Sequence, residues 1–308
     1  MTNPVLADLP APTQILAHHG KSFYWASKFL GAELADRAAR LYQFCRYVDD
    51  LADGDLPGRQ ESLEDIRARL AGEDIAAGPE IEAFITLANS NNIPLSAASE
   101  LLDGMLSDQN LAAVADEAEL LRYCHAVAGT VGLMMCRVLN CEEPRADSFA
   151  IDLGVAMQLT NISRDVLEDA KMARRYLPAS WADLTPAQIA EAGAGDLDSA
   201  GEGCRQQVAE SIGRLLDLSE EYYASALLGI RLLPFRSRLS IAVALRVYRQ
   251  IGWVLRRRKL AWWKGRVMVT PGEKILLSLR SLADLRPVKM PAHRAKLHQH
   301  LQGLAGVQ

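Results

Sequence analysis

The 308-residue sequence lacks several features that would assign it quickly to a class of protein. Its five cysteines include no C-x-x-C pair, so the sequence predicts neither a zinc site nor a disulfide framework. No uncharged apolar run reaches the roughly 18 residues that a membrane-spanning helix needs. No P-loop and no G-x-G-x-x-G motif occurs, which argues against a nucleotide phosphate site. Alternating, strand-like patterns between turn signals are also hard to find.

An excess of positive charge is missing too. The formal net charge of −4 argues against a nucleic-acid partner, because nucleic-acid-binding domains are usually basic. The opening residues, MTNPVLADLPAPTQ, have no basic stretch followed by an apolar one, so they do not resemble a secretory signal. Scattered, unpaired cysteines suit a reducing compartment, and we therefore expect a cytoplasmic location.

Helix-forming residues are what the sequence has in abundance. Ala, Leu, Glu, Arg and Gln dominate, and the 49% of apolar residues can build a sizeable core. Apolar residues recur at three- and four-residue spacing, which predicts helices over 13–30, 34–53, 61–71, 78–90, 95–109, 117–140, 146–170, 204–229 and 235–263. We predict one all-α domain over residues 1–308, with 1–12 and 290–308 peripheral or flexible.

The segment YQFCRYVDDLADG (42–54) places three aspartates at the end of an apolar helix. Tyr42, Arg46, Asp49 and Asp53 follow helical spacing and share one face. The carboxylates of Asp49 and Asp53 are expected to lie about 6 Å apart, where they repel. They also lie near the helix C-terminus, where the helix dipole disfavours negative charge. A hard cation would reverse both effects, because Mg²⁺ takes oxygen ligands and often bridges carboxylates to a substrate phosphate.

Two other interpretations of this cluster compete with a metal site. A solvated acidic helix end is the simpler interpretation when the cluster is taken alone. A calcium-binding EF-hand loop fails, because Leu51 and Gln60 would occupy ligand positions 3 and 12. Asp50 points about 100° away from Asp49 and is left out of the predicted site.

A second cluster, QLTNISRDVLED (158–169), makes a solvated acidic face less plausible. Its polar stripe again has i, i+3, i+4 spacing on an otherwise apolar helix, and consists of Gln158, Asn161, Asp165 and Asp169. All four side chains carry oxygen ligands. Two such helices facing each other across a pocket could hold several Mg²⁺ ions.

Arginines accompany both clusters: Arg46 in the first, Arg164 in the second, and Arg174 and Arg175 just downstream beside Tyr176. A diphosphate is bound well by metal bridges together with guanidinium groups. Because no nucleotide motif is present and the helices are apolar, the pattern favours a diphosphate attached to a hydrocarbon.

Taken together, these motifs resemble the squalene/phytoene synthase family, the all-α head-to-head prenyl synthases. The resemblance rests on HGKSFYWAS (19–27), YQFCRYVDDLAD (42–53), YCHAVAGTVG (123–132), QLTNISRDVLED (158–169) and RRYLP (174–178), which follow one another along nearly the whole chain. The segment AVALRVYRQIGWVLRR…RVMVTPGEKILLSLRSL (242–282) is most similar to bacterial phytoene synthases. The resemblance implies an isoprenoid-synthase-type helical bundle around a central apolar cavity.

The resemblance also implies an activity and a set of roles. Two geranylgeranyl diphosphates would be joined through a cyclopropylcarbinyl diphosphate to give phytoene, with Mg²⁺ or substituting Mn²⁺ and without NADPH. The implied metal ligands are Asp49, Asp53, Asn161, Asp165 and Asp169. The implied substrate-binding residues are Ser22, Phe23, Arg46, Tyr123, Gln158, Asn161, Arg164, Arg174 and Tyr176. Tyr42 and Tyr248 are assigned to the catalytic set with the four aspartates, because aromatic rings can stabilise carbocations. The expected assembly is a monomer or weak dimer.

Several alternatives stay open at this point. A C30 synthase making presqualene diphosphate, dehydrosqualene or squalene from farnesyl diphosphate is the main rival, since pocket depth cannot be read from the sequence. A non-catalytic, metal-binding helical scaffold is the rival outside enzymes. The stretch WVLRRRKLAWWKGR (253–266) suits peripheral membrane contact or a solvated basic face. The stretch HRAKLHQH (293–300) is interpreted as a frayed polar tail, with metal binding as its alternative.

Overall fold

The structure is a computed structural model, and it describes residues 11–54, 59–108, 114–195, 199–285 and 292–307. Within these ranges the regular elements are helices, which confirms the all-α prediction. Those that match predicted segments are α1 (Pro12–His19), α2 (Lys21–Ser27), α3 (Ala32–Asp53), α4 (Arg59–Leu70), α5 (Pro79–Asn91), α6 (Leu95–Asp108), α7 (Glu117–Cys124), η2 (His125–Gly129), α8 (Thr130–Val138), α9 (Ala146–Lys171), α11 (Ser199–Gly229) and α12 (Phe235–Arg257).

Two predicted helices are shorter than the sequence suggests. The segment 13–30 is broken at Gly20, where a Cβ would lie 2.9 Å from the Leu16 side chain and 3.1 Å from the Tyr42 ring. The segment 235–263 ends as a helix at Arg257, because Lys259 and Leu260 adopt positive φ angles of 54° and 55°. The chain therefore turns away where apolar periodicity alone would continue it.

Two further helices, α10 (Pro186–Ala192) and α13 (Pro271–Ser281), were not predicted. Each begins with a capping box, formed by Thr185 with Gln188 and by Thr270 with Glu273. Each also has proline in its first turn, a position that does not require a backbone N–H donor. This start signal is present in the sequence, but neither helix carries a long apolar stripe.

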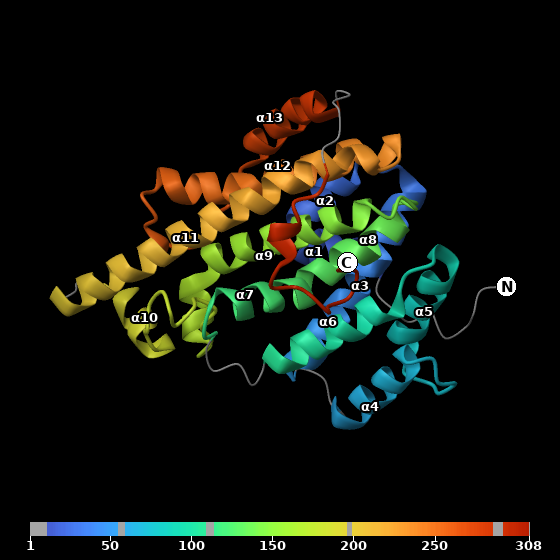
Figure 1. The fold of residues 1–308 in the computed structure, drawn as a ribbon, viewed down its shortest axis with the longest axis horizontal. Coiled ribbons are helices and arrows are strands. Elements are labelled where there is room, and N and C mark those ends of the chain that lie inside the picture. Colours follow the sequence, from blue (N-terminus) through green and yellow to red (C-terminus); the bar gives the residue numbers. More distant parts are fainter. Residues whose placement is uncertain (1–10, 55–58, 109–113, 196–198, 286–291, 308) are drawn as a thin grey trace.

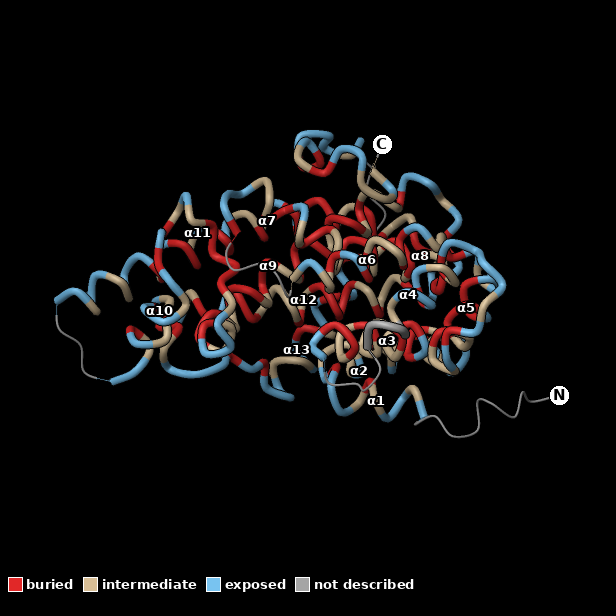
Figure 2. The backbone as a smooth tube through the Cα atoms, turned by 90° about the horizontal axis from the view of Figure 1, so that it is seen from below, coloured by how far each residue is buried: buried red, intermediate tan, exposed pale blue. Residues whose placement is uncertain are grey.

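Helix α9 runs through the middle of the molecule and packs against α8, α10, α11 and α12 (Figure 1). Buried backbone gathers around it, while exposed segments lie at the periphery (Figure 2). Glycines permit the closest approaches: a Cβ at Gly154 would lie 2.2 Å from the Ala128 carbonyl oxygen, and one at Gly132 equally close to that of Ala150. These contacts hold α9 directly against η2 and α8.

The C-terminal segment, predicted to be peripheral or flexible, packs onto the helices in its described part, residues 292–307. Leu301 is fully buried, and the Tyr222 hydroxyl donates to the Leu297 carbonyl oxygen at 2.6 Å. The Arg122 guanidinium donates to the His300 carbonyl oxygen at 3.1 Å. The helices in the described ranges include none that is both long enough and apolar enough to span a bilayer.

Candidate active site

A cavity of about 280 Å³ lies beside α9, surrounded by α2, α3, α8, α11 and α12. Its lining from α9 repeats at three- and four-residue spacing and comprises Ala146, Phe149, Ala150, Leu153, Gly154, Met157, Gln158 and Asn161. The stripe is therefore apolar in its first half and polar at its end. Since Asp165 and Asp169 continue the same helical face, the acidic motif lies beyond the polar end of the cavity.

Aromatic residues stand at this polar end. Phe23, Tyr42 and Tyr248 all line the cavity, and the Phe23 ring lies 5.0 Å from that of Tyr248 and 6.4 Å from that of Tyr42. Burial, followed by the neighbouring Tyr248, raises the pKa of Tyr42 to about 12. Burial likewise raises the pKa of Tyr248. Both phenols are therefore neutral at physiological pH. Ser22, next in the chain to Phe23, is not part of the cavity lining.

The first aspartate motif is held by Arg46. Its guanidinium donates to Asp49 Oδ2 at 2.9 Å and forms a second ion pair with Asp50. Asp50 thus lies within reach of the motif's arginine even though its side chain leaves the helix on a different side from Asp49. The second motif is held in the same manner: Arg164 donates to Asp165 through two bonds of 2.8 and 2.5 Å.

Arg174 joins the two motifs. Its guanidinium donates to Asp53 Oδ1 at 2.5 Å, and its backbone N–H donates to the Asp169 carbonyl oxygen at 2.9 Å. Its positive charge lowers the pKa of both Asp49 and Asp169, although other effects outweigh it. The structure therefore brings the two predicted acidic clusters to one place, with Arg174 between them.

Two of these carboxyl groups are held in an unfavourable environment. Burial, together with repulsion from Asp53 and Asp50, raises the pKa of Asp49 to about 6. Burial, together with the charge of Asp165, raises the pKa of Asp169 to about 7. Carboxyl groups with strongly perturbed pKa values beside a cavity are candidates for a functional site.

Two site residues were missed by the sequence analysis. Arg266 pairs with Asp165, its Nε lying 2.9 Å from Oδ1. Asp108, at the end of α6, accepts a hydrogen bond of 2.7 Å from the Tyr176 hydroxyl, and its charge acts on Asp53 and Asp169. Neither belongs to a repeating stripe, so the sequence carries no pattern that would identify them.

Tyr123 and Tyr176 lie away from the cavity lining. Their rings stack with centroids 5.0 Å apart and planes inclined by 14°. Since Tyr176 binds Asp108, this pair supports the acidic cluster and does not form part of the hydrocarbon wall. Tyr123 and Tyr176, which the resemblance implies to be substrate-binding residues, are therefore placed beside the acidic cluster and not along the cavity.

The site contains polar atoms that are buried without a hydrogen-bond partner among the described residues. They are Asn161 Oδ1, Asp108 Oδ1 and Arg46 Nε. A buried oxygen without a donor is costly, and so is a buried N–H without an acceptor. Two unpaired oxygens and one unpaired guanidinium N–H, beside repelling carboxylates, fit a site that receives cations and an anionic group together.

The chain is similar to known proteins over most of its length. The family model described as squalene/phytoene synthase matches residues 16–273. The 15-cis-phytoene synthase of Pantoea ananas is 34% identical over 307 residues, covering 95% of this chain and 96% of the relative. That of a Paracoccus species is 35% identical, covering 85% and 87%.

Solved structures agree on the fold. A dehydrosqualene synthase crystallised with a ligand superposes with a TM-score of 0.74 at 24% identity, covering 89% of this chain and 95% of that one. A squalene synthase from Alicyclobacillus acidocaldarius gives a TM-score of 0.62 at 21% identity, covering 83% and 98%. The helical arrangement is that of isoprenoid synthases, and the chain belongs to the squalene/phytoene synthase family.

Proposed function

We propose that this chain joins two geranylgeranyl diphosphates head to head, through prephytoene diphosphate, to give 15-cis-phytoene with release of diphosphate. The observation that carries the proposal is the α9 stripe, which lines an apolar cavity and continues into an acidic motif bridged to a second one by Arg174. Relatives about 34% identical over most of their length bear the name 15-cis-phytoene synthase. The proposed product places the reaction in carotenoid synthesis.

The proposed metal ligands are Asp49, Asp53, Asn161, Asp165 and Asp169. They fit Mg²⁺, or Mn²⁺ in its place, because they offer oxygen atoms only and one of these, Asn161 Oδ1, is buried without a donor. When bound, the metal supplies positive charge that stabilises the diphosphate leaving group.

The role that we propose for the arginines follows from the ion pairs that they form in the structure. Arg46, Arg164 and Arg174 each neutralise a motif aspartate in the structure. With those carboxylates bound to metal, the three guanidinium groups would be available to diphosphate oxygens, which they match with paired N–H donors. Exchange of partners would keep every charge compensated before and after substrate binding.

The cavity has the character that a carbocation reaction needs. Its apolar wall excludes water, which would otherwise quench an allylic cation. The rings of Phe23, Tyr42 and Tyr248 present π-faces that attract positive charge. Because the tyrosines are neutral, their hydroxyls do not add a phenolate that could trap the cation.

The decisive experiment is incubation of the purified chain and Mg²⁺ with radiolabelled geranylgeranyl or farnesyl diphosphate, with and without NADPH. We expect phytoene from the C20 substrate, with no effect of NADPH, because the conversion includes no reduction. A C30 product as the main one, or no product from geranylgeranyl diphosphate, would sink the phytoene assignment in favour of the C30 alternative. No product from either substrate would favour a binding scaffold.

Membrane contact is a further part of the proposal, but the surface that supports it is not the one singled out in the sequence. Of the tryptophans in 253–266, Trp262 is buried and donates to the Arg205 carbonyl oxygen at 3.2 Å, and the Arg205 guanidinium lies 4.5 Å from the ring of Trp263. Among the three tryptophans of this stretch, only Trp253 has a largely exposed side chain. The stretch as a whole is therefore no aromatic anchor.

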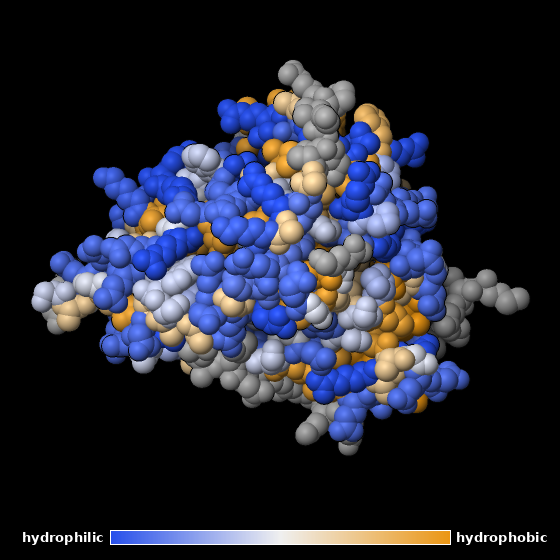
Figure 3. All heavy atoms as spheres, viewed as in Figure 1, coloured by the Kyte–Doolittle hydropathy of each residue, from blue (hydrophilic) through white to orange (hydrophobic). Residues whose placement is uncertain are grey.

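Helix α13 supplies a better surface. Large apolar side chains are exposed on it and at its end: Ile275, Leu276, Leu279 and Leu282. Hydrophobic spheres appear among hydrophilic ones at the upper end of the face in Figure 3, where α13 lies. Lys274 adjoins this surface, and burial together with the charges of Lys21 and Lys28 lowers the pKa of Lys274. An apolar helix face with clustered lysines fits an anionic bilayer.

The position of this surface suits delivery of a hydrocarbon. Helix α2 adjoins α13, since Trp25 Nε1 donates to Ser278 Oγ at 3.1 Å, while Phe23 and Ser27 of α2 line the cavity. Helix α2 therefore contacts both the cavity and the helix that carries the apolar surface. Leu276→Glu and Leu279→Glu should abolish co-sedimentation with phosphatidylglycerol vesicles, and Ala224→Glu on the exposed side of α11 should not. Equal sedimentation of all three proteins would remove α13 as the contact.

A further inference from the structure

Asp152 is a buried carboxyl group that the proposed reaction does not use. It lies on α9 and has no exposed surface. Asp152 precedes Asn161 by nine positions on the helix. Its side chain therefore leaves α9 about 180° from that of Asn161, on the side away from the cavity. It also lies about 20 Å along the helix from Asp165, so it cannot belong to the diphosphate site. Its partners must come from another part of the chain.

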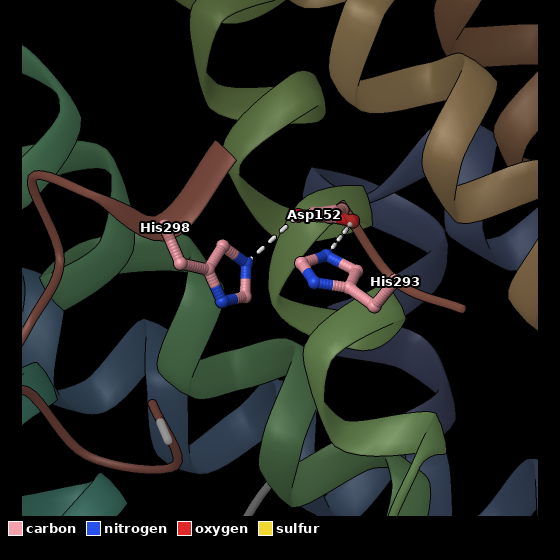
Figure 4. A group of neighbouring side chains, drawn as sticks. All are labelled: Asp152, His293 and His298. Carbon is pink, nitrogen blue, oxygen red and sulfur yellow. Dashed lines mark hydrogen bonds and ion pairs between the residues drawn. The ribbon is translucent and has the colours of Figure 1, made fainter. Parts of the chain in front are cut away.

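Those partners are two histidines of the C-terminal segment. His293 Nε2 lies 2.8 Å from Asp152 Oδ2, and His298 Nε2 lies 2.9 Å from Oδ1. Figure 4 shows a nitrogen of each imidazole ring directed at the one carboxylate, and the two ring centroids lie 4.4 Å apart, so the rings approach it side by side. One ligand atom from each residue falls within 4.8 Å of the other two. His298 is buried, and His293 is largely so.

The charge of this group needs compensation. Burial by itself raises the pKa of Asp152, but the hydrogen bonds from His293 and His298 lower it overall, so the carboxylate form is favoured. Two neutral imidazoles would leave one negative charge buried. The ion pairs of Asp152 among the described residues are those with the two histidines. Tyr222, the other titratable group close by, contributes no positive charge: it donates to the Leu297 carbonyl oxygen, and burial and then Asp152 raise its pKa.

We propose that Asp152, His293 and His298 form a second metal site, for a divalent transition metal, with Zn²⁺ the ion that fits best. Two imidazole nitrogens and one carboxylate oxygen are a ligand set that zinc uses, whereas Mg²⁺ prefers oxygen alone. Zinc ligands at about 2.0 Å in tetrahedral geometry are roughly 3.3 Å apart. The present distances, 2.8 Å from His293 to Oδ2 and 2.9 Å from His298 to Oδ1, are somewhat shorter than that value, and one ligand atom of each residue lies within 4.8 Å of the other two. Modest shifts of the side chains would therefore bring three ligands to one ion.

The site fastens the end of the chain to the central helix. Residues 293–298 approach α9 at Asp152, and the segment then continues to α6, where the Ala305 N–H donates to Glu100 Oε2 at 2.8 Å. His125 Nε2 lies 3.0 Å from the Ala305 carbonyl oxygen. A metal at Asp152 would therefore fix the start of a segment whose far end is already held by hydrogen bonds. Its role is structural, and the chemistry at Asp165 proceeds without it.

The test is metal binding by the full chain, freed of metal with a chelator and then dialysed against Zn²⁺ in the presence of excess Mg²⁺. We expect about one zinc per chain by mass spectrometry of the metal. His293→Gln and His298→Gln should lose it. His300→Gln, in the same segment, and Asp49→Asn, at the diphosphate site, should keep it.

A second measurement does not depend on how the variants fold. Co²⁺ bound to wild-type protein should give the intense visible absorption of tetrahedral nitrogen–oxygen ligation, and added Zn²⁺ should abolish it. Absence of both stoichiometric zinc and this absorption would overturn the proposal, and Asp152 would then be held by its hydrogen bonds with the two histidines alone. Retention of zinc in both histidine variants would overturn it equally.

Discussion

Arg174 and Asp53 are 121 residues apart in the sequence, and the guanidinium of one donates to the carboxylate of the other at 2.5 Å. Asp53 ends α3, while Arg174 follows α9, so this ion pair connects the C-terminal ends of the two helices that carry the acidic motifs. The backbone N–H of Arg174 also donates to the Asp169 carbonyl oxygen. Arg174 therefore contacts both motifs at once.

Arg174→Gln should lower the kcat for phytoene formation by roughly 100-fold, the usual cost of removing one group that stabilises developing charge. The loss is expected because Asp53 loses its cation and the diphosphate loses a guanidinium donor. Turnover is measured with radiolabelled geranylgeranyl diphosphate. Arg40→Gln is the matched control, since Arg40 pairs with Asp36 on the exposed side of the same α3. Equal activity of the two variants would remove Arg174 from the site.

Asp49→Asn should leave substrate binding measurable but reduce turnover by at least about 100-fold, because a metal ligand is worth several kcal/mol of charge stabilisation. The amide keeps the shape and loses the charge that attracts the cation. Binding is followed by calorimetry with a non-hydrolysable diphosphate analogue, and turnover by product formation. Asp36→Asn, also on α3, should behave as wild type. Near-normal turnover by Asp49→Asn would remove Asp49 from the proposed ligands.

The parts of this site that the sequence predicts are those with a helical repeat. Asp49 with Asp53, and Asp165 with Asp169, are recognisable because four-residue spacing forces them onto one face. The same rule predicts that Gln158 and Asn161 share that face, and both do line the cavity. Local geometry was sufficient for these residues, since one helix determines their relation.

Residues placed by tertiary packing could not be predicted in this manner. Asp108 contacts Tyr176, which is 68 residues away in the sequence, and Arg266 contacts Asp165, which is 101 residues away. His298 contacts Asp152, which is 146 residues away, although the polar sequence around His298 predicts a frayed tail. Each contact depends on how whole helices and the C-terminal segment pack, which is information that no single periodic pattern contains.

Asp169→Asn should stabilise the metal-free protein at pH 8 while it impairs catalysis. The pKa of Asp169 is raised to about 7 in the folded state from 3.8, so the folded protein binds the extra proton and loses stability as the pH rises from about 4 to 7. Above pH 7 the charged group costs the fold at least a few tenths of a kcal/mol, the usual cost of a like-charge i, i+4 pair. Asparagine removes that cost, and below pH 4 the two proteins should converge.

Urea unfolding in EDTA at pH 4, 6 and 8 measures this difference. Asp36→Asn serves as the control, because Asp36 is exposed and paired with Arg40. A variant that is less stable than wild type at pH 8 would show that the Asp169 carboxylate is favourably placed without metal, contrary to the burial and repulsion described.

Ala150→Phe should convert the enzyme from the C20 to the C15 substrate. Ala150 lines the cavity, about 17 Å along α9 from Asn161 by the rise of 1.5 Å per residue, and therefore lies toward the end remote from the acidic motifs. A phenyl ring there would occupy space that the last isoprene units of a geranylgeranyl chain need, while a farnesyl chain ends sooner. Product analysis with each diphosphate should show loss of C40 product and gain of C30 product. Ala224→Phe, on the exposed side of α11, should keep the wild-type preference. Unchanged C40 synthesis by a folded Ala150→Phe would mean that the hydrocarbon chains run elsewhere in the molecule.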